Sequence, residues 1–148
     1  MRAVGQAFLE KKQELLEANK PVGNLISILG AKELPQLNSK GKREWESRAD
    51  NKLGEIIIRT HLPLSGEEGL DPLSRNHINA LTSDLVAVLP GGNGTLSELQ
   101  LAWEYGKKII IYLGKGQVGG KTSQELVKEF SGLKVANTTQ EFEKRLTE

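Results

Sequence analysis

Apolar and polar residues alternate along the chain in blocks whose spacing predicts both strands and helices. Four short apolar runs are bounded by turn-forming or charged residues, as is typical of strands. They are LISIL (25–29), EIIIRT (55–60), DLVAVLP (84–90) and KIIIYLG (108–114), and LKVA follows as a short last strand. Helical spacing predicts helices over 2–19, from Asp71-Pro72 to about Thr82, over 95–106 and 122–130, and in TQEFEKRL near the C-terminus.

The order of these elements predicts an α/β fold. The run DLVAVLP is apolar without interruption, which is typical of a strand buried on both faces of a parallel sheet. Strands that alternate with helices in this way pack as a sheet between two helical layers. We therefore predict a three-layer α/β sandwich around a parallel sheet, formed by residues 1–148 as a single domain.

Composition narrows the classes of function. The 148 residues carry 20 Lys and Arg against 19 Asp and Glu, a net charge of +1, so no overall field attracts nucleic acid or an anionic membrane. There is no cysteine, which excludes disulfides and thiolate metal sites, and two histidines, His61 and His77, make a protein-built transition-metal site unexpected. The N-terminus is charged throughout and has no apolar core typical of a signal peptide. The sequence predicts a cytoplasmic protein with no metal and no membrane contact.

The polar segment 32–55 is predicted to be a long surface excursion. Its basic residues, together with Trp45, suggest a nucleic-acid patch as one interpretation. Acidic residues are interleaved with them, which favours a solvated loop instead. We therefore expect no nucleic-acid partner.

A glycine-rich loop lies between the third predicted strand and the helix that follows. In LPGGNGTLSELQLAWEYG (89–106), Gly91, Gly92 and Gly94 stand at the carboxyl end of that strand, where open parallel sheets bind ligands. Glycine leaves no Cβ between the backbone amides and a ligand, and the N-terminus of the next helix favours phosphate. Thr95 can add a hydroxyl donor. A tight turn without a ligand is the alternative interpretation.

Two common phosphate motifs are absent. The dinucleotide fingerprint would begin at Gly92 and needs a glycine where Ser97 stands. The segment GKGQVGGKTS ends like a Walker motif at Gly120-Lys121-Thr122, but position 115, which needs glycine, is Lys115. We predict that this segment is a flexible loop.

Two charged residues are candidates for chemistry. Glu98 fits a capping box with Thr95 as N-cap, yet a carboxylate one turn from a bound phosphate would also lie near the rest of the ligand. Arg75 is either a solvated charge on the helix ending near Thr82, on one face with Asn79, or a ligand-binding residue. Asp84 begins a strand and is interpreted as structural, because it lies at the other end of the sheet.

Together, these pieces resemble the LOG ("Lonely guy") family of the lysine decarboxylase-like, Rossmann-type nucleotide-binding superfamily. Its P-G-G-x-G-T-x-x-E motif is matched from Pro90 to Glu98, and Arg75 lies fifteen residues before Pro90, as in the family pattern. The resemblance runs from the first helix to near the C-terminus and is strongest over 74–113. It makes the predicted fold Rossmann-like.

The resemblance implies a phosphoribohydrolase. Such an enzyme uses water to cleave the N-glycosidic bond of AMP or N6-substituted AMP, giving base and ribose 5-phosphate. The glycine loop, Gly91, Gly92, Asn93, Gly94 and Thr95, would hold the 5′-phosphate. Glu98 would face the ribose and act on water or on the oxocarbenium-like transition state, while Arg75 would anchor the substrate and keep Glu98 ionised. The expected state is a homodimer paired through the helices that carry both residues, with no cofactor.

One departure from the family favours an alternative. The family pattern begins with a strand, a helix and a second strand that ends in another glycine-rich loop, whereas MRAVGQAFLEKK resembles the helix that follows. An N-terminally shortened sheet is therefore expected. The alternative function is that of a non-catalytic protein that binds or carries a nucleotide or the molybdenum cofactor.

Overall fold

A computed structural model describes residues 2–44, 46 and 55–146. The chain divides into two compact units, Met1–Pro63 and Leu64–Glu148. The interpretation of Trp45 as part of a basic patch falls outside the described residues. Parallel strands and helices make up both units, which confirms the α/β class of a small Rossmann-like fold.

The N-terminal unit combines one long helix with a small parallel sheet. Its elements are α1 (Arg2–Glu17), β1 (Ile26–Leu29), β2 (Gln36–Leu37), β3 (Arg43–Glu44) and β4 (Ile56–Arg59). Strands β1 and β4 pair in parallel from Ile26 opposite Ile56 to Leu29 opposite Arg59, as their isoleucine-rich runs predict. Lys12 of α1 bonds Glu55 at 2.5 Å, and this hydrogen bond lowers the pKa of the Glu55 carboxyl.

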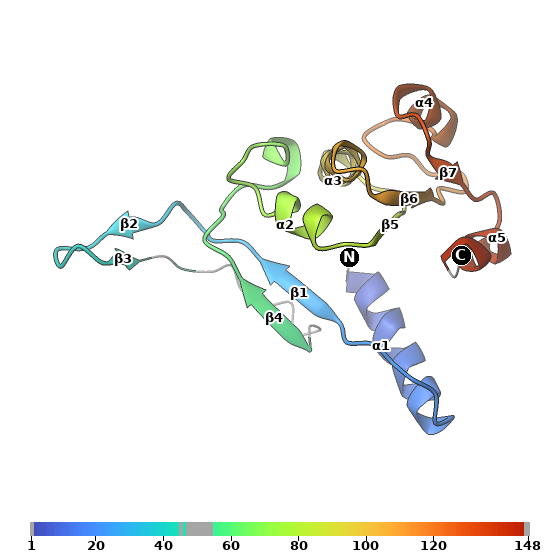
Figure 1. The fold of residues 1–148 in the computed structure, drawn as a ribbon, viewed down its shortest axis with the longest axis horizontal. Helices are drawn as coiled ribbons and strands as arrows, with labels where there is room; N and C mark the ends of the chain where they lie inside the picture. The colour runs from blue at the N-terminus through green and yellow to red at the C-terminus, as the bar shows by residue number, and fades with distance from the viewer. Residues whose placement is uncertain (1, 45, 47–54, 147–148) are drawn as a thin grey trace. The chain divides into compact units, whose positions relative to one another are not determined.

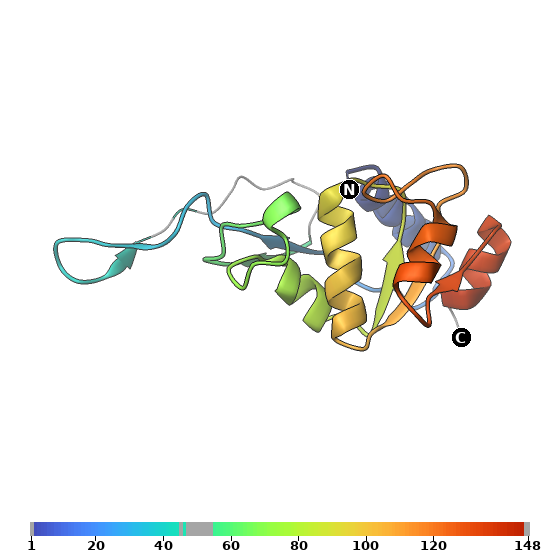
Figure 2. The same ribbon diagram turned by 90° about the horizontal axis from the view of Figure 1, so that it is seen from above.

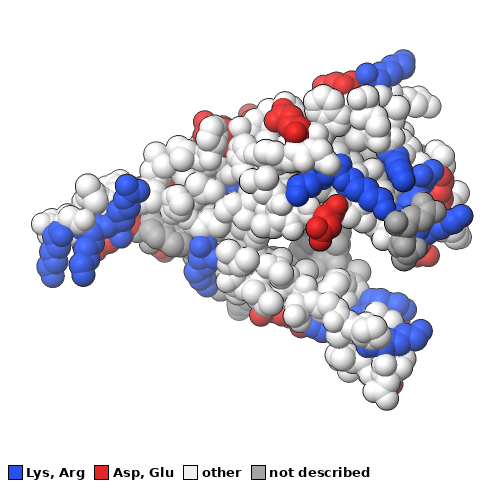
Figure 3. All heavy atoms as spheres, viewed as in Figure 1, with Lys and Arg blue, Asp and Glu red and all other residues white. Residues whose placement is uncertain are grey.

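Strands β2 and β3 form a separate antiparallel hairpin within the segment predicted to be a surface excursion. All four of its strand residues are exposed, as a solvated loop requires. Figure 3 shows that Lys and Arg side chains gather on this hairpin, whereas both signs of charge are interspersed over the C-terminal unit on the face drawn.

The C-terminal unit contains a three-stranded parallel sheet in the order β5-β6-β7. Its elements in chain order are η1 (Gly66–Glu68), α2 (Asn76–Leu81), β5 (Leu85–Val88), α3 (Asn93–Glu104), β6 (Lys108–Ile111), α4 (Ser123–Glu129), β7 (Lys134–Val135) and α5 (Thr139–Leu146). Figures 1 and 2 show α3 and α4 on one face of this sheet, with α5 on the other. Successive helices thus connect parallel neighbours, as in βαβ units.

The core of this unit follows the alternation of side chains along β6. Ile109 and Ile111 point into a buried cluster with Val88 of β5 and Leu99 of α3. On the other face, the ring of Tyr112 stacks on Phe142 of α5, with 5.4 Å between ring centroids.

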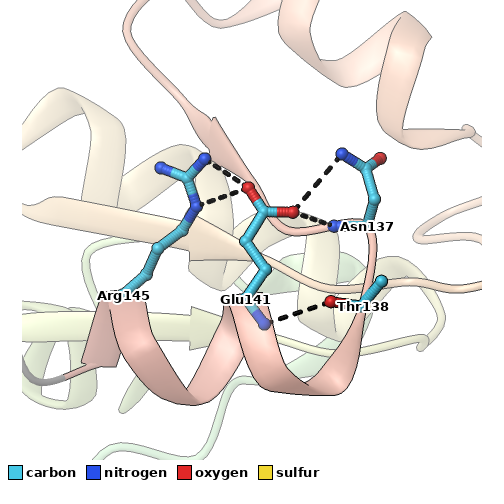
Figure 4. A network of polar contacts seen from close by, with 4 residues as sticks. All are labelled: Asn137, Thr138, Glu141 and Arg145. Atoms are coloured by element: carbon cyan, nitrogen blue, oxygen red, sulfur yellow. Dashed lines mark hydrogen bonds and ion pairs between the residues drawn. The ribbon is translucent and has the colours of Figure 1, made fainter.

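Polar contacts hold the start of α5 (Figure 4). The backbone N–H of Glu141 donates to the hydroxyl of Thr138 at 3.1 Å, and the Glu141 carboxylate accepts from the N–H of Asn137 at 2.8 Å and from Arg145 Nη2 at 2.6 Å. The hydrogen bond from the Asn137 N–H, followed by that from Arg145, stabilises the charged carboxylate and so lowers the pKa of Glu141. The predicted C-terminal helix TQEFEKRL is confirmed as α5, and the bond from Glu141 to Thr138 adds a contact that was not predicted.

The predicted start of α2 was wrong. Asp71 was expected to cap a helix that opens at Pro72, but the carboxylate of Asp71 accepts the N–H of Leu73 at 2.8 Å within a turn. The helix begins at Asn76 instead. Asp and Asn side chains stabilise such turns as readily as helix starts, so the local sequence did not distinguish the two.

Candidate functional site

The glycine loop leaves β5 at its carboxyl end and leads directly into α3. Gly92 is the N-cap residue of that helix, in an extended conformation with φ −88° and ψ −156°. Its carbonyl accepts hydrogen bonds from the N–H groups of Thr95 and Leu96, each at 3.1 Å. The helix therefore begins at Asn93, two residues before the predicted start at Thr95. The predicted capping box of Thr95 with Glu98 is wrong, because both residues lie inside the helix.

The start of α3 has no cap from the protein. No side chain bonds to it at the N-cap, and its first turn contains no acidic residue. In the described part of the chain, the N–H groups of Gly92, Asn93 and Gly94 have no acceptor. Free amides and the positive end of the helix dipole together favour an anion at this point.

Gly91 has a different role from the one its place in the motif predicts. Its N–H donates to the carbonyl of Gln117 at 2.9 Å, and its own carbonyl accepts from Gly119 at 3.0 Å, so the Gly91 amide is already paired. A Cβ on Gly91 would lie 2.2 Å from Thr95 Oγ1, whereas a Cβ on Gly92 would meet nothing within 4 Å. Gly91 is thus needed for packing, and Gly92 borders open space.

Residues 114–122 are fastened to the glycine loop rather than left as the predicted flexible segment. Val118 is fully buried and lies opposite Gly91 in an isolated bridge. Gly119 has φ +55°, and a Cβ there would come within 2.7 Å of Leu96 Cδ2. These contacts with residues distant in sequence hold the loop in one conformation. The glycine-rich sequence predicted a flexible loop because glycine itself permits many backbone conformations.

Glu98 is held by a tertiary hydrogen bond. Its half-buried carboxylate accepts from Asn79 Nδ2 of α2 at 2.9 Å. Asn79 lies one turn after Arg75, and its N–H donates to the Arg75 carbonyl at 3.2 Å. Arg75 is half-buried and occupies the N-cap position of α2. Helices α2 and α3 therefore contact each other at the bond between Asn79 and Glu98. Asn79 is the residue that was predicted to share a helix face with Arg75.

Three buried polar residues of this region were missed from the sequence. Ser74 is fully buried, and Asn76 and Ser97 are 3% and 6% exposed. Asn76 Nδ2 donates to Ser97 Oγ at 3.1 Å, and the backbone N–H of Asn76 donates to Ser74 Oγ at 3.1 Å. The burial of Asn76 could have been predicted from its position, because it lies four residues before the apolar Ala80 and both therefore share one face of α2. This network joins the start of α2 to the first turns of α3.

The described residues contain no group of three or more His, Asp or Glu side chains that could hold a metal ion. Within the same residues, no helix combines the length and hydropathy needed to cross a bilayer.

Comparison with known proteins gives one match. The model of the SLOG cluster4 family matches residues 33–143, which include the glycine loop, Arg75 and Glu98. No curated protein and no solved structure matches the chain. The SLOG superfamily is related to LOG and Rossmann-like proteins, so the match supports the coarse assignment made from the sequence and a nucleotide-related function. The chain belongs to the SLOG cluster4 family.

Proposed function

We propose that the chain binds a nucleoside 5′-monophosphate, with the phosphate at the start of α3. The observation that carries this proposal is the uncapped helix N-terminus, where the amides of Gly92, Asn93 and Gly94 lack an acceptor in the described residues. These amides follow a parallel strand at its carboxyl end, the usual position of phosphate in such sheets. Thr95 Oγ1 lies close to Gly91, since a Cβ there would come within 2.2 Å of it, and its hydroxyl is proposed as a further donor to the same anion.

We further propose that the bound nucleotide is hydrolysed at its N-glycosidic bond. The C1′–N bond breaks with its electron pair passing to the base, which takes a proton, and a water oxygen bonds to C1′ and loses a proton. Glu98 is the proposed acceptor of that proton and stabilises the positive charge that develops on the ribose. Its bond to Asn79 at 2.9 Å supports this role, because a capping function no longer explains the residue. Arg75 is proposed to anchor the substrate.

Binding without hydrolysis, as in a nucleotide sensor or a carrier of the molybdenum cofactor, is the second candidate. The described residues give Glu98 one side-chain partner, the neutral amide of Asn79. No acid that could protonate the leaving base is bonded to this pair in that part of the chain.

One experiment separates the two candidates. The protein is incubated with AMP and with N6-substituted AMP, ribose 5-phosphate is assayed, and binding is measured by calorimetry. Hydrolysis requires both binding and release of ribose 5-phosphate, whereas a carrier or sensor binds without release. Absence of binding by either nucleotide contradicts the proposed site.

We also propose that the protein is a homodimer that pairs through α2 and α3. Large apolar side chains on or next to these helices remain exposed, including Leu81 at 52% and Trp103 at 41%. Exposed apolar side chains of this size on neighbouring helices are candidates for coverage by a partner. Analytical ultracentrifugation at micromolar concentration should give twice the chain mass of 16.2 kDa. A stable species of 16.2 kDa would contradict the dimer.

A further inference from the structure

The short helix η1 is fixed against the start of α3. Ser97 Oγ of α3 donates to the carbonyl of Gly66 at 3.2 Å, and a Cβ on Gly94 would lie 3.4 Å from Gly66 Cα. At the other end of η1, a Cβ on Gly69 would meet Ser97 Oγ at 2.0 Å. With a side-chain bond and two close backbone approaches, η1 has a defined position beside the glycine loop.

This packing brings a carboxylate to the first residue of α3. Glu67 Oε1 accepts a hydrogen bond from Asn93 Nδ2 at 3.2 Å. The Glu67 side chain is exposed, and the N–H of Asn93 is one of the amides that lack an acceptor in the described residues. A fixed negative charge therefore stands next to the place where the phosphate is proposed to bind.

The two ends of the glycine loop differ in what they offer an anion. At Gly91, the backbone N–H and carbonyl are already hydrogen-bonded to Gln117 and Gly119, so its amide is not free to bind an anion. At the other end, the carboxylate of Glu67 lies beside Asn93, so a phosphate chain longer than one unit would add negative charge near it. Each added phosphate brings about one further negative charge, and like charges within about 8 Å repel even in water.

We propose that Glu67 is a specificity-determining residue, which makes the site prefer a nucleoside monophosphate to the corresponding di- and triphosphates. This inference rests on the proposed function, because it assigns the selectivity of that same site. Glu67 acts by repulsion, so its contribution lies in the rejection of longer phosphate chains.

The test compares Glu67→Gln with Glu68→Gln. Glutamine at 67 retains an oxygen that accepts from Asn93 and removes only the charge, and Glu68 is the adjacent, also exposed carboxylate of η1. Dissociation constants for AMP, ADP and ATP are measured on the full chain by calorimetry at low salt, and melting temperatures verify folding. The wild type should bind AMP most tightly. Glu67→Gln should reduce the AMP-over-ADP preference roughly threefold, and the AMP-over-ATP preference more.

The outcomes are distinct. An unchanged preference in Glu67→Gln, or an equal change in both variants, overturns the role of Glu67 while AMP binding stands. Failure of the wild type to bind AMP overturns the proposed function itself. Loss of the wild-type preference at high salt is also expected, because ions screen the repulsion. A preference that survives both high salt and Glu67→Gln contradicts an electrostatic origin.

Discussion

Helices α3 and α4 follow neighbouring strands of one parallel sheet. Both have the pattern Thr-x-x-Glu at or near their N-termini, but the two helices begin in different ways. At α4, Thr122 is the N-cap and forms a complete capping box with Glu125, whose carboxylate accepts the N–H of Thr122 at 2.8 Å. Helix α3 instead starts at Asn93, two residues before Thr95, and no side chain forms a cap hydrogen bond at its N-cap residue, Gly92.

The difference arises from the residues before each threonine. Gly119 and Gly120 have φ of +55° and +78°, so they cannot continue α4 backwards, and Thr122 becomes its first cap. Gly92 is extended instead and starts α3 early, which places Thr95 inside the helix. Glu98 is then free to bond Asn79 of α2. The same four-residue pattern thus forms a capping box at α4 and none at α3.

The largest expected effect is on the hydrolysis in which Glu98 is proposed to act. Glu98→Gln should lower turnover of AMP-type substrates a hundred- to a thousandfold, on the order of 3–4 kcal/mol, with nucleotide affinity nearly unchanged. Glutamine keeps the size of the side chain and an oxygen for Asn79, and it removes the charge that an oxocarbenium-like transition state needs. Steady-state kinetics and calorimetry measure the two quantities.

Glu125→Gln is the matched control, because it makes the same change in the same pattern at the closed helix. It should leave turnover at the wild-type level. Wild-type turnover in Glu98→Gln would remove Glu98 from the mechanism, and equal losses in both variants would assign the effect to folding.

The next effect is on stability and distinguishes the two adjacent glycines of the loop. Gly91→Ala should destabilise the fold by about 1–3 kcal/mol, because its Cβ would lie 2.2 Å from Thr95 Oγ1. Gly92→Ala should cost less than about 1 kcal/mol, since its Cβ meets nothing within 4 Å. It should instead weaken AMP binding, because the methyl group enters the space proposed for phosphate. Chemical denaturation and calorimetry report the two effects, and equal destabilisation by both substitutions would contradict the assigned roles.

The smallest effect is the pH dependence of the closed helix. Hydrogen bonds from Thr122, first from its N–H, lower the pKa of Glu125 below 4.5. A lowered carboxyl pKa adds stability that is fully present above the unfolded value and is lost as pH falls through the folded value. Wild type should therefore melt above Glu125→Gln near neutral pH, and this advantage should shrink as the pH falls below 4.5 and vanish once the folded-state carboxyl is protonated. A difference in melting temperature that does not change with pH would argue against the capping box.

The sequence predicted the elements whose signal is local. The runs LVAV and KIII identified two parallel strands, and β5 and β6 lie within the predicted ranges. The prediction that β5 is buried on both faces was wrong, because β5 is an edge strand in which Ala87 is exposed and only Val88 is buried. Glu98 was recognised by motif and position, but its partner Asn79 was not, since the pairing depends on how α2 packs on α3.

Features that depend on tertiary contacts were not predicted. Segment 114–122 looked flexible because it is rich in glycine, whereas its bonds to Gly91 join residues far apart in sequence. No pattern in the sequence singled out Glu67, and only the packing of η1 on α3 brings it to Asn93. Local patterns carry no information on such pairings, and tertiary context decides between a turn and a helix start.

Helix α3 begins with amides that are proposed to bind phosphate, whereas α4 begins with a capping box. Titration of ¹⁵N-labelled protein with AMP, followed by amide chemical shifts, tests both helix starts in one sample. The account predicts large, saturable shifts for Gly92, Asn93 and Gly94, with little change for Ser123, Gln124 and Glu125. Shifts of equal size at the two starts, or none at Gly92–Gly94 at saturating AMP, would contradict it.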